Sequence, residues 1–170
     1  MALGPAPSSE SARLWSNAAM SDIQVSRVIT ASADELYDMV SDLRRMGEWS
    51  PESTGGEWIK GATGAAVGAR FKGANANGSK RWTTTAIVEQ ADRGKAFVFR
   101  VTVGPIKVAR WSYRFSPGET GTTVTETWAD QRGWLTKRAG GSASGVADRA
   151  AHNRSGMETT LAKLAAAAEG

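Results

Sequence analysis

One acidic residue falls where the hydrophobic pattern predicts a buried position. Glu126 alternates with Val124 and Trp128 in a β-branched and aromatic segment, so the three side chains are expected on one face of a strand. A carboxyl group on an apolar face must be paired or have an altered pKa. We expect an arginine to neutralise Glu126. If it is unpaired, Glu126 becomes a candidate general acid/base for an enolisation or an aldol cyclisation.

A second polar residue, Asn153, interrupts an apolar helical stripe. At about 100° per residue, a helix over residues 145–164 brings six side chains onto one narrow face, as a helix lying on a sheet requires. These are Val146, Ala150, Asn153, Met157, Leu161 and Leu164. A buried amide must find partners. Asn153 therefore either makes a structural hydrogen bond to the loop of the second helix or offers a donor and an acceptor to a ligand.

The only histidine, His152, lies about 140° from Met157 in the same helical projection, so it is expected to point away from the sheet. An exposed or rim position, with Asp148 as an i, i+4 partner, is the interpretation we prefer to a catalytic triad. One histidine and no cysteine leave almost no material for a zinc site. No phosphate-binding or dinucleotide fingerprint is present. The sequence predicts neither a metal nor a cofactor.

The elements that position these residues can be assigned from local patterns. Residues 23–30 predict a first strand, and Ser32 with Glu35 forms a capping box that starts a helix. Residues 44–48 extend the helical region, and Pro51 stops it. Six further strands are expected at 56–60, 67–74, 80–90, 95–103, 107–116 and 122–130, with a type I′ turn at Asn77-Gly78. Short turns between them indicate an antiparallel meander.

Aromatic residues gather on one face of these predicted strands. If the long helix covers this face, the side chains expected to line a pocket between them are Phe71, Trp82, Phe99, Trp111, Tyr113, Trp128 and Met157. A packed core is the alternative interpretation, although seven tryptophans in a small domain suit a wide apolar pocket. Trp49 and Trp58 flank a Pro/Gly-rich loop beside the expected mouth, and are candidate gate and ligand-binding residues.

Composition limits the class of protein. The chain has 170 residues, which fits one domain at 23–168 after a disordered extension at 1–22. The net charge of +4 comes from scattered basic residues, so a nucleic-acid partner is not expected. No apolar run approaches the ~20 residues of a membrane span, and the first residues lack signal-peptide features. Together with the absence of cysteine, this is compatible with a cytoplasmic protein.

Several segments carry a family resemblance. They are VSRVITASADELYDMVSD at 25–42, RMGEWSPES at 45–53, TGGEW at 54–58, GARFKG at 68–73, RWTTTAIVEQA at 81–91, ARWSYRFSP at 109–117, TVTETWADQRGW at 123–134 and DRAAHNRSGMETTLAKL at 148–164. With these segments the chain resembles the START-like superfamily, also called SRPBCC, Bet v 1-like or polyketide cyclase/dehydrase-like, and especially its small actinobacterial members. The resemblance implies an α+β helix-grip fold. In it, a seven-stranded antiparallel sheet curls around a long C-terminal helix, with two short helices after strand 1 and an apolar cavity.

The family includes both carriers and enzymes, so the resemblance leaves function open. The leading hypothesis is binding of a hydrophobic small molecule, such as a lipid, polyketide or quinone. A polyketide cyclase/aromatase that works without metal or nucleotide is the enzymatic alternative, with Glu126 and Asn153 as its catalytic candidates. A protein-interaction module, with the cavity filled by its own aromatic residues, is a third. The sequence does not separate a monomer from a homodimer.

Overall fold

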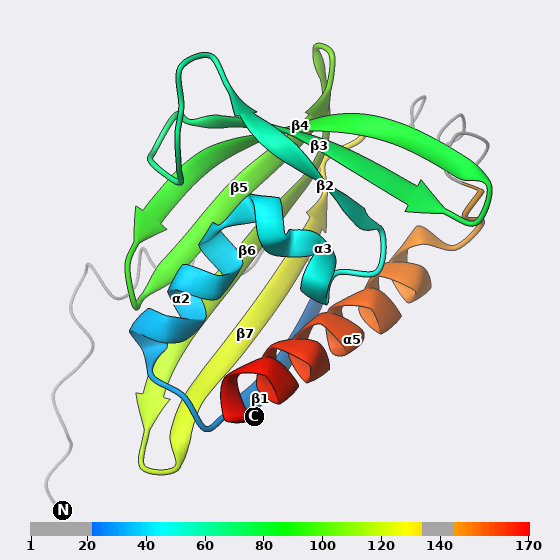
Figure 1. Cartoon of the computed structure of the whole chain (residues 1–170). Helices are drawn as coiled ribbons and strands as arrows, with labels where there is room; N and C mark the ends of the chain where they lie inside the picture. Colours follow the sequence, from blue (N-terminus) through cyan, green and yellow to red (C-terminus); the bar gives the residue numbers. More distant parts are fainter. Residues whose placement is uncertain (1–21, 134–144) are drawn as a thin grey trace, which may run out of the picture.

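A computed structural model describes residues 22–133 and 145–170. In it, helices lie on the concave side of a strongly curved antiparallel sheet (Figure 1). The predicted extension, up to residue 21, lies outside the described residues, as do residues 134–144. The architecture is the helix-grip fold that the resemblance implied.

The sheet has seven strands in the order β1-β7-β6-β5-β4-β3-β2, with every neighbouring pair antiparallel. The strands are β1 (Ile23–Ile29), β2 (Ser53–Ile59), β3 (Arg70–Asn77), β4 (Lys80–Asp92), β5 (Ala96–Val103), β6 (Ile106–Gly118) and β7 (Gly121–Asp130). Only β1 is out of sequence order, because the two short helices separate it from the meander and it pairs with β7.

The predicted turn at Asn77-Gly78 exists, but its type differs from the prediction. Asn77 pairs with Lys80, so the two loop residues are Gly78 and Ser79. Gly78 has φ +56°, whereas Ser79 is not among the residues with positive φ. Type I′ requires positive φ at both central positions. The type I′ assignment was therefore wrong, since it placed the glycine one position too late in the turn.

The short helices begin as the sequence predicted. In α2 (Ala33–Ser41), the Oγ of Ser32 accepts the Glu35 backbone N–H at 3.2 Å and caps the helix. The 3₁₀ helix η2 (Leu43–Arg45) and α3 (Met46–Trp49) follow, and the chain becomes extended at Ser50, immediately before Pro51. Residues before proline disfavour the helical conformation, which explains the end of α3.

The long helix α5 (Arg149–Glu169) lies along β1 with one face turned toward the sheet (Figure 1). Its buried side chains are Asn153, Met157, Thr160, Leu161, Leu164 and Ala165. The predicted stripe is correct except at its start. The helix begins only at Arg149, where the Asp148 side chain caps the Ala151 N–H. Ala150 in this first turn is exposed, and Val146 is buried but precedes the helix.

The core is concentrated at one end of the concave face. There, α2 packs with the C-terminal half of α5 and the sheet, through residues such as Leu36, Val40, Phe97 and Leu164, all of them fully buried. Tyr37 adds an edge-on contact to Phe97, with ring centroids 6.1 Å apart. No part of α2 lies against the N-terminal half of α5 (Figure 1).

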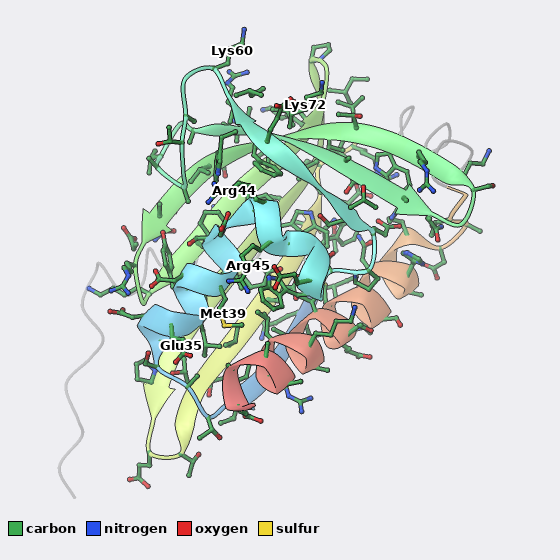
Figure 2. The ribbon with its side chains drawn as sticks, in the orientation of Figure 1. Glu35, Met39, Arg44, Arg45, Lys60 and Lys72 are labelled. Carbon is green, nitrogen blue, oxygen red and sulfur yellow. The ribbon has the colours of Figure 1, made fainter. Side chains whose placement is uncertain are left out.

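The two strands at the ends of the sheet have different surroundings. Along β1, the backbone is approached by α5 side chains: Glu169 Oε1 accepts the Thr30 N–H at 2.9 Å, and an Arg154 N–H is 3.5 Å from the Gln24 carbonyl. Strand β2 is irregular, because its register with β3 shifts between Ser53 and Gly55. Figure 2 shows Lys60, which follows β2, extending outward from the molecule.

Candidate functional site

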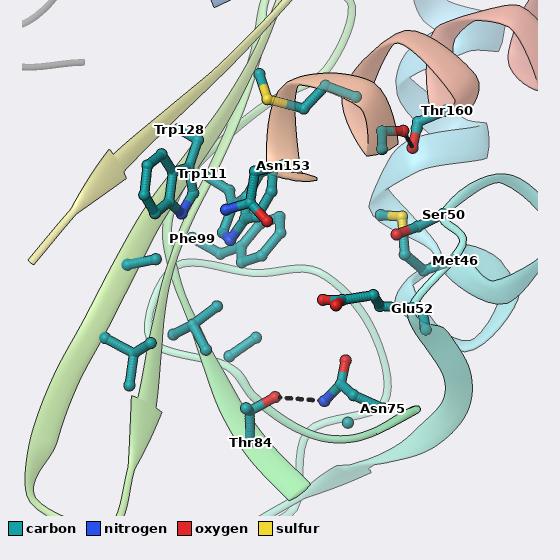
Figure 3. Close-up of a pocket in the computed structure, with 18 of the residues that line it drawn as sticks. Met46, Ser50, Glu52, Asn75, Thr84, Phe99, Trp111, Trp128, Asn153 and Thr160 are labelled. Atoms are coloured by element: carbon teal, nitrogen blue, oxygen red, sulfur yellow. Dashed lines mark hydrogen bonds between the residues drawn. The ribbon is translucent and has the colours of Figure 1, made fainter. Parts of the chain in front are cut away.

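A cavity of about 860 Å³ lies between the N-terminal half of α5 and the sheet, with the 3₁₀ helix, α3 and the start of β2 on its other side. Figure 3 shows this space, with the Asn153 end of α5 above an aromatic group from the strands. Its size falls in the upper part of the range of small-molecule sites, about 300–1,000 Å³.

Most of the residues proposed from the sequence line this cavity. They are Phe71, Trp82, Phe99, Trp111, Tyr113, Glu126, Trp128, Asn153 and Met157. The strand alternation explains the agreement, because β6 and β7 pair Trp111 with Trp128 and Tyr113 with Glu126 on the concave face. The rings of Trp111 and Trp128 are 6.4 Å apart and tilted by 54°, which gives the cavity a broad aromatic wall.

Trp49 and Trp58 do not line the cavity, so their predicted role as gate residues has no support in the geometry. Trp49 is 3% exposed and packs in the core, with the Arg45 guanidinium 5.1 Å from its ring centroid. Trp58 stands edge-on to Phe71 at 5.2 Å. Both indoles pack against neighbouring side chains. The single turn of α3 orients Trp49, and the pairing of β2 with β3 orients Trp58. The sequence reasoning placed them by loop composition alone.

Glu126 is the most unusual residue of the site. It is 2% exposed, and its Oε1 accepts the Tyr113 hydroxyl at 2.7 Å. Its Oε2 is buried and has no hydrogen-bond partner among the described residues. Burial raises the pKa of Glu126 to about 8, although the hydrogen bond from Tyr113 lowers it. At neutral pH the carboxyl group is therefore mainly protonated and uncharged.

The arginine expected beside Glu126 is absent from its surroundings in the described chain, and that prediction was wrong. On β6, Trp111 and Tyr113 point to the concave face, so the alternating Arg110 points to the opposite face. There it binds Glu89 at 2.8 Å, with Arg100 3.5 Å from the same carboxylate. Tyr113 takes the place of the arginine. Burial, with Glu126 nearby, raises the pKa of Tyr113 well above its usual value, so the phenol stays a donor.

Asn153 lies 7% exposed on the cavity side of α5. In Figure 3 its amide faces the group formed by Phe99, Trp111 and Trp128. None of the hydrogen bonds between described residues includes this amide, so the contact expected with the second-helix loop is not formed. Its role toward a ligand remains a prediction.

A cluster of charged residues borders the cavity at the start of α5. Glu52 accepts hydrogen bonds from Arg149 and from His152 Nε2, each at 2.9 Å. The Arg149 guanidinium also lies 5.9 Å from the Trp82 ring centroid. His152 is thus at the rim, as predicted, but its partner is Glu52. Asp148 was the wrong partner because its side chain is used as the N-cap.

Sequence reasoning missed Glu52 and Arg149. Neither follows an amphipathic pattern: Glu52 comes directly after Pro51, and Arg149 is the first residue of α5. They are 97 residues apart and meet only because the chain leaves α3 beside the helix start. At the β3–β4 side of the cavity, Asn75 Nδ2 donates to Thr84 Oγ1 at 3.1 Å (Figure 3). No sequence signal singled out that pair.

The described residues also limit other kinds of site. In the ranges 22–133 and 145–170, no group of three or more His, Cys, Asp or Glu side chains is arranged to hold a metal ion. None of the helices within these ranges combines the length and the apolar character needed to cross a membrane.

The fold and the aromatic cavity define a helix-grip protein of the START-like superfamily. The chain belongs to the family described as polyketide cyclase/dehydrase and lipid transport, whose model matches residues 20–169. No curated protein matches the sequence.

Solved structures with the same fold include a close relative. The Polyketide_cyc-like protein Cgl2372 from Corynebacterium glutamicum is 30% identical over 86% of this chain and 90% of its own, with a TM-score of 0.60. The di-domain ARO/CYC StfQ of the steffimycin biosynthetic pathway is 13% identical (86% and 50% covered, TM-score 0.67). Major latex-like protein 151 from Panax ginseng is 12% identical (86% and 95% covered, TM-score 0.65). The last two show the fold alone.

Proposed function

We propose that this protein binds a hydrophobic small molecule, of the lipid, polyketide or quinone type, in the cavity between α5 and the sheet. The observation that carries the proposal is the space itself, about 860 Å³ lined largely by aromatic and aliphatic side chains. An apolar wall of this extent gains free energy when a ligand covers it, at about 25 cal/mol per Å² of buried apolar surface.

The space argues against the hypothesis of an interaction module whose cavity is filled by its own aromatic residues. Phe99, Trp111 and Trp128 stand at the wall and leave the interior open (Figure 3). The family, with cyclases and lipid transport proteins in its description, supports a ligand-binding or cyclase role.

The test compares ligand affinity between the wild-type protein and a variant whose cavity is blocked. A panel containing a long-chain fatty acid, a naphthoquinone and a three-ring aromatic ketone is titrated while native mass spectrometry and tryptophan fluorescence are followed. Val101 lines the cavity, so Val101→Trp should block it and lower affinity at least about tenfold. Val28 is 54% exposed and away from the cavity, so Val28→Trp is the matched control. Failure of every compound to bind, or equal binding by Val101→Trp, refutes the proposal.

A second candidate function is a polyketide cyclase-type reaction, favoured by one observation. Glu126 has a pKa of about 8, so both of its protonation states are accessible near neutral pH, as a general acid/base requires. In an aldol cyclisation the Glu126 carboxylate would take a proton from the carbon between two carbonyls. That carbon would form a C–C bond with a second carbonyl carbon as the C=O π bond breaks, and the carboxyl group would return the proton to the oxygen that becomes the hydroxyl group. A poly-β-carbonyl substrate analogue, followed by mass spectrometry and absorbance, tests this. Glu126→Gln should keep binding and lose turnover.

A further inference from the structure

We propose that the ligand is a neutral molecule carrying a carbonyl oxygen, and that the Glu126 carboxyl, held by Tyr113, donates a hydrogen bond to that oxygen. This inference rests on the proposed function, because it concerns the polar contact that a ligand in the same cavity makes. Beyond that function, it names the chemical class of the ligand group that contacts Glu126.

The geometry leaves one oxygen of Glu126 without a hydrogen-bond partner among the described residues. Tyr113 lies directly opposite on β6 and donates to Oε1, so that oxygen has its partner. Oε2 is buried with none among the described residues. A buried polar atom without a partner costs about 1–3 kcal/mol. A ligand that completes this hydrogen bond removes the cost, whereas a purely apolar ligand leaves it in place.

The protonation state decides which ligand atom fits. Burial disfavours the charged form, and the pKa of about 8 makes Glu126 a neutral acid at pH 7. Because the Tyr113 hydroxyl points at Oε1, the proton of the acid is placed on Oε2, which is then a donor. A carbonyl oxygen accepts such a bond. A cationic amine would need the carboxylate, the disfavoured form of this group.

The residues around Glu126 are uncharged or paired with other residues, which favours the protonated form of its carboxyl group. On β6 it meets Tyr113, and across β1 its register partner is Val25. From α5, the buried Asn153 and Met157 are uncharged. The charged residues of the cavity lining are each engaged elsewhere: Glu52 with Arg149 and His152, and Arg132 with Asp130.

The aromatic wall fixes the shape of the rest of the ligand. Trp111 and Trp128 occupy the strand positions next to Tyr113 and Glu126 on the same face. A carbonyl group that reaches Glu126 thus places its attached carbon skeleton against two indole rings, which favours a flat, conjugated skeleton. Asn153 lies beside these rings (Figure 3) and offers an amide to a second oxygen. The ligand class is an aromatic ketone, aldehyde or quinone.

Three probes of the same size test the proposal by calorimetry at pH 6: 2-acetylnaphthalene, 2-isopropenylnaphthalene and 1-(2-naphthyl)ethylamine. The ketone should bind the wild-type protein about fivefold to tenfold more tightly than the alkene, as one added hydrogen bond predicts, and more tightly than the amine. The preference should disappear as pH rises through about 8, where Glu126 loses its proton. Glu126→Gln keeps a donor and should retain the preference at every pH. Glu126→Met should lose it.

The outcomes separate this inference from the proposed function. Equal affinity for ketone and alkene, tighter binding of the amine, or the same pH dependence in Glu126→Gln overturns the inference, while ligand binding in the cavity stands. Absence of binding by all three probes overturns the inference, whereas the proposed function is overturned only when the fatty acid, the naphthoquinone and the three-ring ketone also fail to bind. Circular dichroism and urea unfolding of each variant show that a lost preference does not come from a lost fold.

Discussion

The buried carboxyl group of Glu126 should make the free energy of unfolding depend on pH. In the folded protein Glu126 has a pKa of about 8, against 4.5 for the free side chain. Below pH 4.5 the group is protonated in both states, so its ionisation adds no cost to folding. As pH rises from 4.5 to 8, the unfolded chain gains by releasing the proton and the folded protein does not. The contribution of Glu126 to wild-type stability should therefore fall through this interval and level off above it.

The magnitude follows from the interval between the two pKa values. Each pH unit between them is worth about 1.4 kcal/mol, so the loss amounts to at most about 5 kcal/mol above pH 8. Relaxation around the carboxylate and entry of water reduce it. Glu126→Gln keeps an acceptor for Tyr113 but does not titrate. Relative to wild type, this variant should be of similar stability at pH 4.5 and more stable by several kcal/mol at pH 8.

Urea unfolding followed by tryptophan fluorescence measures the effect at pH 4.5, 6, 7, 8 and 9. The difference between the two proteins is the relevant quantity, because other titrating groups are common to both and cancel. Glu158→Gln, at an exposed position of α5, is the matched control and should show little change. A difference that does not vary with pH, or one that favours the wild type at high pH, refutes the assignment of Glu126 as a neutral buried acid.

Three further substitutions test the elements that position the site. Leu161→Ala, at a 2% exposed position where α5 meets the core, should cost about 2–5 kcal/mol in urea unfolding. Ser32→Ala removes the α2 cap and should cost about 1 kcal/mol, with no change in ligand affinity at the opposite end of the sheet. Gly121→Ala places a methyl group against the Ile29 carbonyl at φ +141° and should cost about 1–3 kcal/mol. Gly64→Ala, with open space around it, should cost far less.

The concave face was predictable because it depends on local alternation. In β7, Val124, Glu126 and Trp128 are buried while the residues between them are more exposed. The helical period of about 100° per residue, applied to α5, gave Asn153 and Met157 correctly as buried residues. These patterns depend only on the periodicity of the backbone, so they can be read without knowing what packs on them.

Partnerships between distant residues could not be predicted in this way. The prediction that an arginine pairs with Glu126 was wrong, because periodicity shows which face a residue occupies but not which side chain lies within hydrogen-bond distance of it. Glu52 and His152 are 100 residues apart and meet through the path of the loop after α3. Trp49 and Trp58 were misplaced for the same reason, because the turn of the four-residue helix α3 decides where the Trp49 indole points and the pairing of β2 with β3 decides where the Trp58 indole points.

The two edge strands of the sheet, β1 and β2, determine how readily a second chain can add to it in concentrated solution. An open sheet offers free N–H and C=O groups at both margins, which a second chain can extend by strand addition. At the β1 margin, two side chains of α5 contact backbone groups: Glu169 accepts from the Thr30 N–H, and Arg154 approaches the Gln24 carbonyl. At the other margin, the register shift of β2 and the positive φ of Gly55 break the regular ladder. The sheet that lines the cavity thus has borders that offer few regular positions for strand addition by a second chain.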